Sequence, residues 1–537
     1  MSLGPGNHLV YGDNLDVLRR RIPDASVDLI YLDPPFNSDA TYNLVVRDPS
    51  GQGSGANIEA FEDTWRWGEA AEAAFQDVRA SGHQRAAAML VAMREALGMS
   101  DLMAYLAMMA VRLVELHRVL KPTGSLYLHC DPTASHYLKT ILDGVFGAQF
   151  FTNEIIWERT NTKAHAFTRF SSSHDVLLHY RKSDQFTWNA LYAPHSESYI
   201  KSHYSNVEEE TGRRYTLGDT TNPNPDRPNL TYEWRGVNKV WRWTREKMQQ
   251  MHDEGRLVYT KSGAPRYKRY LDEMKGTPIT DVWTDIFPIN SQAQERLGYP
   301  TQKPTALLER IILASSDPGH LVLDPFCGCG TTVHAAQKLG RRWIGIDVTH
   351  LAIGLIRKRL SDAFGPIPYG VHGEPADLAS ARQWFQDDSR DKKQWELWAL
   401  SLLGDARPWQ GQKKGADGGR DGVIPFGQTQ KALVSVKGGG VSVKDVRELL
   451  NVLDRDKAQV GILLTLEEPT RPMLAEAAGA GLYALDGWPA VPRCQVVTIE
   501  RAMALRDQSI RLPARRGDNF KAAPREAASP TTRDLFS

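Results

Sequence analysis

Cysteine is scarce in this chain of 537 residues, with only Cys130, Cys327, Cys329 and Cys494. Their spacings do not resemble a zinc cluster. We therefore expect free thiols in a reducing cytoplasm.

Long apolar runs and an excess of one charge are also missing. No apolar run approaches bilayer-spanning length, and the N-terminus has no basic-then-apolar signal peptide, so we expect a cytoplasmic protein without a membrane partner. Lys and Arg number 65 against 64 Asp and Glu, a formal net charge of +1. A nucleic-acid-binding protein of this charge would need a local basic face, so composition leaves the function open.

What the sequence does contain is an alternation of apolar strands and helices. Strands are predicted at 8–12, 27–33 and 124–131, and residues 101–119 have apolar positions at helical spacing. The same alternation resumes at Pro304. It predicts βαβ units and a parallel sheet, which is a doubly wound α/β fold.

The alternation is interrupted, and the interruptions predict the domain boundaries. The chain is long enough for two or three domains. A stretch rich in Asn, Pro, Arg, Trp and Tyr splits the first domain, and a Pro-, Gly- and charge-rich stretch precedes a second α/β pattern. The predicted divisions are a first catalytic half at 1–185, an insert at 186–295, a second half at 296–365, a linker at 366–392, a smaller α/β domain at 393–500 and a disordered tail at 501–537.

A glycine-rich turn, LDPFCGCGTT at 323–332, follows a predicted strand and opens a helix. Glycine allows backbone to approach a ligand closely, here at the carboxyl edge of the sheet. A tight structural connection is the alternative explanation for the turn alone. Asp347 ends the next strand, where an acid can hold ribose hydroxyls, so together these features favour an adenosine-containing cofactor.

Asp33, Pro34, Pro35 and Phe36 follow another predicted strand. An amine on a nucleobase is a poor nucleophile because its lone pair is delocalised into the ring. The Asp33 carboxylate and the Pro34 carbonyl can accept its two hydrogens and free that lone pair, while the prolines stiffen the backbone. Phe36 offers a stacking face for an extruded base. The alternative is a proline-stiffened loop with Phe36 in the core.

The two motifs and their order resemble the β-class DNA amino-methyltransferases, in which an Asp-Pro-Pro-Phe type motif precedes a recognition region and a cofactor motif. The segments 12–14, 116–131 and 301–304 are similar to further motifs of that family, and the resemblance covers roughly residues 7–362. It implies that S-adenosylmethionine is the cofactor and that double-stranded DNA is the partner. The cofactor-binding residues that it implies are Asp13, Thr301, Lys303, Asp324, Phe326, Gly328, Gly330, Thr331 and Asp347.

In that family an aspartate at the first catalytic position usually accompanies transfer to adenine N6. Asp33 therefore predicts an adenine-specific DNA methyltransferase, and cytosine N4 is the alternative. Cys327 and Cys329 sit inside the cofactor turn, where small side chains are needed, so we interpret them as packing residues. A DNA-binding sensor with an idle catalytic core is a further alternative, which the intact Asp33–Phe36 motif disfavours.

The insert alternates arginines with aromatic residues. Arg235, Arg242 and Arg245 are predicted to contact DNA, because arginine can hydrogen-bond both guanine edges and phosphates. Tryptophans in a small core with solvated arginines would be the structural alternative.

The C-terminal pattern resembles the Mrr-like branch of the PD-(D/E)xK nuclease fold over roughly residues 393–485. Asp421 matches the first acid, which implies a Mg²⁺ ligand, and Lys437 matches the lysine. Ser435 stands where the family has Glu, Asp or Gln, and a hydroxyl binds Mg²⁺ more weakly than a carboxylate. Glu396 or Asp417 could supply the missing acid.

Three hypotheses for this domain therefore stay open. It is an inactive or DNA-sensing domain, or an active nuclease in a fused restriction-modification enzyme, or the segment at 417–421 is only a surface turn. The sequence does not decide whether the chain acts as a homodimer.

Overall fold

The computed structural model describes residues 2–35, 66–160, 170–290, 293–297, 299, 301–387, 392–404, 406–409, 419–515 and 522–526, with the backbone of β3 (Thr41–Arg47) and β4 (Gly53–Glu62). Two compact units are present, one at 190–280 and one comprising the chain on either side of it. No described helix is long and apolar enough to cross a membrane.

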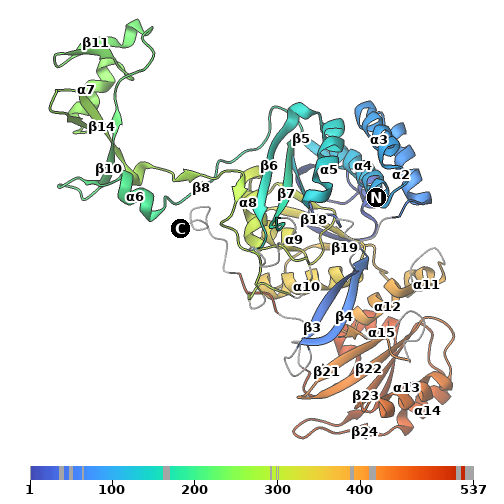
Figure 1. The fold of residues 1–537 in the computed structure, drawn as a ribbon. Coiled ribbons are helices and arrows are strands. Elements are labelled where there is room, and N and C mark those ends of the chain that lie inside the picture. Colours follow the sequence, from blue (N-terminus) through green and yellow to red (C-terminus); the bar gives the residue numbers. More distant parts are fainter. Residues whose placement is uncertain are drawn as a thin grey trace. The chain divides into compact units, whose positions relative to one another are not determined.

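The larger unit is built on a nine-stranded sheet (Figure 1). All neighbouring strands pair in parallel except β7, which runs antiparallel to both β5 and β6. The sheet order is β16 (Val282–Trp283), β6 (Phe151–Glu158), β7 (His174–Arg181), β5 (Leu120–Cys130), β2 (Val27–Leu32), β17 (Leu321–Asp324), β18 (Arg342–Asp347), β1 (His8–Tyr11) and β19 (Gly370–His372).

Helices pack on both faces of this sheet, as a doubly wound fold requires. One group is α1 (Asn14–Arg21), α2 (Glu69–Ala80), α3 (Gln84–Leu97), α4 (Asp101–Val119) and α5 (Pro132–Phe146). The other is α8 (Thr305–Ser315), α9 (Thr331–Lys338) and α10 (His350–Phe364). The fold class predicted from the sequence is confirmed.

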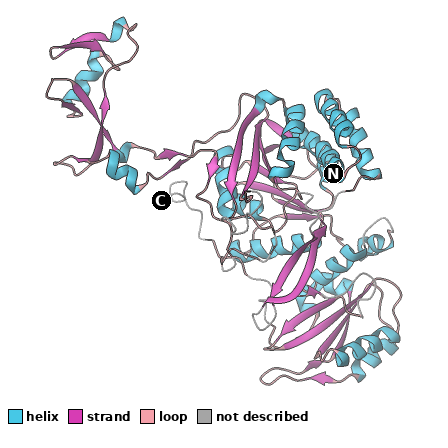
Figure 2. Cartoon of the chain, in the orientation of Figure 1, coloured by secondary structure: helices cyan, strands magenta, loops and turns pink. Residues whose placement is uncertain are grey.

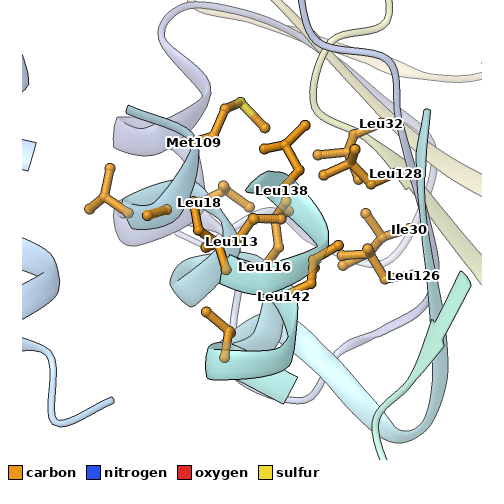
Figure 3. Close-up of a cluster of buried hydrophobic side chains, with 14 of the residues drawn as sticks. Leu18, Ile30, Leu32, Met109, Leu113, Leu116, Leu126, Leu128, Leu138 and Leu142 are labelled. Atoms are coloured by element: carbon orange, nitrogen blue, oxygen red, sulfur yellow. The ribbon is translucent and has the colours of Figure 1, made fainter. Parts of the chain in front are cut away.

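The core under the first group shows why the pattern folds this way. Alternate residues of β2 and β5 face it, since side-chain direction alternates along a strand. Helical spacing in α4 and α5 places leucines opposite them (Figure 3). The labelled members of the cluster are Leu18, Ile30, Leu32, Met109, Leu113, Leu116, Leu126, Leu128, Leu138 and Leu142.

The unit at 190–280 consists mainly of short antiparallel strands with two short helices (Figure 2). A core of Trp234, Trp241, Met248, Met251 and Leu257 holds it together. The sequence predicts an insert up to 295, but Val282 and Trp283 already pair with β6 of the main sheet. Its elements are β8 (Tyr192–Ala193), α6 (Glu197–His203), β9 (Asn206–Val207), β10 (Arg214–Asp219), β11 (Thr231–Trp234), β12 (Val237–Val240), α7 (Arg245–Asp253), β13 (Leu257–Tyr259), β14 (Pro265–Tyr270) and β15 (Thr277–Pro278).

The C-terminal domain has a five-stranded sheet in which β21 is antiparallel to β22, and β22, β23 and β26 are parallel. Its strands are β20 (Arg407–Pro408), β21 (Gly422–Phe426), β22 (Gln430–Lys437), β23 (Val460–Thr465) and β26 (Cys494–Thr498), beside a small pair of β24 (Leu482–Tyr483) and β25 (Val491–Pro492). Its helices are α12 (Lys392–Ser401), α13 (Val443–Arg455), α14 (Arg471–Gly479) and α15 (Ile499–Leu505).

Two expectations need correction. The predicted linker at 366–392 contains β19, which pairs with β1, and helix α11 (Leu378–Gln386), which buries Trp384. The predicted disordered tail at 501–537 contains most of α15 and a buried Ala523. In the described parts of both segments, a few apolar residues anchor a polar sequence, which composition does not reveal.

Candidate active site

The ends of four neighbouring strands meet at one edge of the main sheet. Because β2 and β17 are adjacent and parallel, Asp33 and Asp324 are brought to the same edge, with Asp13 after β1 and Asp347 at the end of β18. A cavity of about 360 Å³ lies there. Of the predicted residues, those that line it are Asp13, Asp33, Pro34, Pro35, Thr301, Lys303, Asp324, Phe326, Gly328, Thr331 and Asp347. Phe36 lies outside the described residues.

The glycine-rich turn has the backbone that its sequence demands. Gly330 has φ +75° and Gly328 has φ +49°, values that L side chains rarely adopt. A Cβ on Gly330 would lie 2.7 Å from Ile356 Cγ1, and one on Gly328 would lie 3.3 Å from Tyr299 Cε1. Gly330 is not among the described lining residues, so its role is to shape the turn at the start of α9.

Two carboxylates, the buried Asp324 and the half-buried Asp347, hold the turn in place. Asp324 accepts a hydrogen bond from the Phe326 amide at 3.0 Å, and Asp347 accepts one from the Gly328 amide at 2.9 Å. Asp347 also accepts from the amide and hydroxyl of Thr349. Burial raises the pKa of Asp324 to about 7 and that of Asp347 to about 6. Burial therefore disfavours the charged form of both carboxylates, and a cationic ligand beside them would favour it.

Lys303 Nζ lies 2.5 Å from Asp33 Oδ2, and the two side chains are only 12% and 17% exposed. The sequence resemblance assigns Lys303 to the cofactor. In the structure its ammonium contacts the predicted catalytic carboxylate, so one carboxylate oxygen of Asp33 is held in a fixed direction.

Sequence reasoning missed Arg112 and Asn14, which build one wall of the cavity. Arg112 is 4% exposed; its guanidinium donates to Asp13 Oδ2 at 2.8 Å and to Asn14 Oδ1 at 2.6 Å. Asn14 in turn donates to the Pro325 carbonyl at 2.8 Å. Asp13 follows β1 and caps α1. Through Arg112 and Asn14 it is linked to Pro325 in the cofactor turn. The sequence does contain a sign of this role, because Arg112 is a charged residue within the otherwise apolar run at 103–114.

Cys327 and Cys329 are buried in the turn. Burial raises the pKa of both thiols, which disfavours the nucleophilic thiolate.

The three predicted DNA-contacting arginines are all exposed. Arg235 donates to His252 Nε2, Arg242 donates to the Thr221 carbonyl, and Arg245 lies over the Tyr232 ring. Within the described unit none of the three pairs with a carboxylate. Arg213, by contrast, pairs with Asp272 at 2.7 Å.

The nuclease-like residues are only partly assembled. Asp421 precedes β21 and is buried; its backbone amide donates to the Val434 carbonyl, and its Oδ2 accepts the Val436 amide at 2.6 Å. Lys437 Nζ lies 3.8 Å from Asp445 Oδ1. Glu396 pairs with Lys393, and Asp417 lies outside the described residues. Across the described chain, no group of three or more His, Cys, Asp or Glu residues could hold a metal ion.

Comparison with known proteins matches residues 27–358 to the DNA methylase family and residues 401–488 to a restriction endonuclease family. The chain is similar to the type II methyltransferase M.EcaI of Enterobacter cloacae, with 29% identity over 68% of this chain and 71% of that protein. It is 27% identical to the type III restriction-modification enzyme StyLTI Mod subunit of Salmonella typhimurium over 62% of this chain and 50% of that protein. It is 26% identical to the DNA adenine methyltransferase YhdJ of Escherichia coli over 66% of this chain and 83% of that protein.

Proposed function

The chain belongs to the DNA methylase family, and we propose that it methylates adenine N6 in double-stranded DNA with S-adenosylmethionine as the methyl donor. The observation that carries this proposal is the placement of Asp33 and Pro34 in the same cavity as the glycine turn and its two acids. The acceptors for an amine and the binding site for a cofactor thus share one space.

The cavity residues fit S-adenosylmethionine. Its volume of about 360 Å³ lies in the range of small-molecule sites. The turn at Gly328 would bring backbone against the ligand, Asp347 would accept from ribose hydroxyls, and the two acids complement a cationic sulfonium. When bound, the cofactor supplies an activated methyl group.

The residues of the chain then prepare the amine. Asp33 and the Pro34 carbonyl accept its two N–H groups and draw the nitrogen toward tetrahedral geometry. Lys303 holds one oxygen of Asp33 and leaves the other for the base. The amine needs no covalent intermediate with the protein, and the proton that it loses can pass to Asp33 or to water.

The adenine assignment rests on Asp33 and on a relative named as a DNA adenine methyltransferase. To test it, DNA is incubated with the protein and labelled cofactor, and the nucleosides are then separated. We expect N6-methyladenine; N4-methylcytosine would contradict the adenine assignment but leave the amine chemistry standing.

Arg235, Arg242 and Arg245 are proposed to contact DNA, since they are exposed cations without carboxylate partners in the described unit. Alanine at a base-contacting arginine should weaken binding by about 1–3 kcal/mol and relax specificity, whereas loss of a phosphate contact should weaken all sequences alike. The matched control is Arg213→Ala, because Arg213 already pairs with Asp272. Equal DNA affinity of the triple variant and the control would remove these arginines from the interface.

For the C-terminal domain we propose DNA binding without efficient cleavage. Asp421 accepts the amide of Val436, the residue after Ser435, so one of its oxygens is already used. No described group of three or more His, Cys, Asp or Glu residues could hold a metal ion. Lys437 faces Asp445. One acid with a neutral hydroxyl gives Mg²⁺ too little compensating charge. A homodimeric state and a cytoplasmic location stay predictions.

A further inference from the structure

An arginine that does not line the cavity joins two of the segments that do. Arg359 of α10 is only 3% exposed. Its Nη1 donates to the Cys329 carbonyl at 3.3 Å and to Thr331 Oγ1 at 3.1 Å, both in the glycine-rich turn. Its Nη2 donates to Thr305 Oγ1 at 3.2 Å, at the start of α8. The turn and the segment 301–303 both line the cavity, whereas Arg359 is not among its described lining residues.

The segment that leads into α8 is itself held by Glu295. Glu295 Oε2 accepts from the Thr305 amide at 3.1 Å and from its hydroxyl at 2.8 Å. Gln302, which lines the cavity, donates to the Glu295 carbonyl at 2.6 Å. The Thr305 hydroxyl therefore donates to Glu295 and accepts from Arg359, so one small side chain connects the buried cation to a carboxylate.

Stability alone does not explain an arginine at this buried position. Within the described chain, none of its hydrogen bonds goes directly to a carboxylate. A buried charge costs desolvation, and apolar side chains of similar volume are often at least as stabilising. An apolar side chain cannot bind two separate segments, however, whereas a planar guanidinium presents several donors in fixed directions. The arginine is therefore suited to fixing the spacing between the glycine-rich turn and the segment 301–305.

We propose that Arg359 is a positioning residue for the cofactor. It ties the glycine-rich turn to the segment 301–305, so that two walls of the cavity are already correctly spaced before S-adenosylmethionine binds. A preorganised site loses less conformational freedom on binding, which raises its affinity. The inference rests on the proposed function, because it takes S-adenosylmethionine as the ligand of this cavity.

The first test measures cofactor affinity by calorimetry in Arg359→Met, which keeps a long side chain but has no donors. Well below the melting temperature, the Kd for S-adenosylmethionine should rise about tenfold, the scale of one lost hydrogen bond to a charged group. At saturating cofactor, kcat for DNA methylation should stay within about threefold, because bound cofactor restores the spacing. A merely structural role predicts the opposite, since fewer folded molecules would bind with an unchanged Kd and kcat would fall.

Arg310→Met is the matched control. Arg310 of α8 is also buried, at 5% exposure, but its guanidinium pairs with Asp285 at 2.9 Å. It does not line the cavity among the described residues. Loss of this arginine should lower the melting temperature and leave the Kd unchanged. If Arg359→Met does not fold, Arg359→Lys replaces it, because one ammonium keeps the buried charge but lacks the fork that reaches both segments. Its Kd should rise as well.

A double-mutant cycle tests the connection itself. Thr305→Val removes the hydroxyl that accepts from Arg359 but keeps the amide bond to Glu295, so it should weaken cofactor binding by a similar factor. The double variant Arg359→Met/Thr305→Val should bind no more weakly than Arg359→Met, because the connection is already broken.

Three results would overturn the proposal: an unchanged Kd in Arg359→Met, an equal rise in Arg310→Met, or losses of affinity that multiply in the double variant. Each of these leaves the cofactor assignment standing, because the wild type still binds S-adenosylmethionine. A wild type that binds no S-adenosylmethionine would overturn the proposed function and this inference with it.

Discussion

Two acidic sites in this chain lie at sheet edges, and their carboxylates have different partners. At the methylase cavity, Asp324 and Asp347 fix the turn through backbone amides, and Asp33 stays in reach of the cavity. At the nuclease-like edge, Asp421 uses an oxygen to bind its own sheet, and its neighbour Ser435 carries no charge.

The difference teaches that a shared fold does not by itself imply a reaction, which depends on the partners of the individual side chains. The methylase cavity divides the work, with some acids holding backbone and another free for the substrate. The nuclease-like site has one acid for both tasks. In Asp421 one carboxylate oxygen already accepts a backbone amide, which leaves a single oxygen for any ligand.

The largest effect on activity is expected for Asp33→Ala at the methylase cavity. Asp33 is proposed to act on the amine and makes no described contact with the turn, so methyl transfer should fall by about a thousandfold, the upper range for losing one preorganised polar group. Cofactor affinity, measured by calorimetry, should stay within a few-fold. Lost cofactor binding in a normally melting variant would place Asp33 among the cofactor ligands instead.

Gly330→Val tests the turn itself. A β-branched residue is strained at φ +75°, and its Cβ would meet Ile356, so cofactor affinity should fall by more than about tenfold. Phe326→Ala should weaken it through lost contact with the ligand. Gly354→Ala is the control, because a Cβ there has no neighbour within 4 Å. Unchanged affinity in both test variants would remove the cofactor assignment.

Much of this site could be predicted from local patterns. The helical spacing at 101–119 appears as α4 with the same bounds, and the turn at 323–332 joins β17 to α9. Strand order then brings Asp33 and Asp324 together, as the family resemblance implies.

The contacts that tune the site could not be predicted in this way. Lys303 meets Asp33 across 270 positions, and Arg112 meets Asp13 across 99. Arg359 meets Thr305 across 54 positions. Such pairs depend on sheet order and strand direction, and neither leaves a local signal in one sequence.

A smaller effect is expected when the pH is changed, because cofactor affinity at the methylase site should depend on the ionisation of Asp347. Asp347 has a pKa of about 6, so its carboxylate dominates at pH 7 and its acid form at pH 5. Binding that needs the ionised form should weaken about tenfold between these values. A pKa raised by folding makes protonation favour the folded state, so unfolding through Asp347 does not explain the loss. Asp347→Asn should bind weakly at both pH values; a wild type with flat affinity would exclude an ionised Asp347 as the ribose acceptor.

Asp421 should give the smallest effect on activity. Asp421→Ala leaves the buried Val436 amide unpaired and should lower the free energy of unfolding by about 1–3 kcal/mol, whereas Asp421→Asn keeps an acceptor and should lose less. Methylation should stay within twofold in both, and Mg²⁺ should induce no efficient cleavage of unmethylated DNA by any of the three proteins. If Asp421 has a structural role, the two variants should differ in stability. If Asp421 binds a metal ion for cleavage, both variants should lose the nuclease activity equally. Efficient Mg²⁺-dependent cutting by the wild type, lost in Asp421→Asn and in Lys437→Ala, would make the second site an active nuclease and erase the contrast between the two edges.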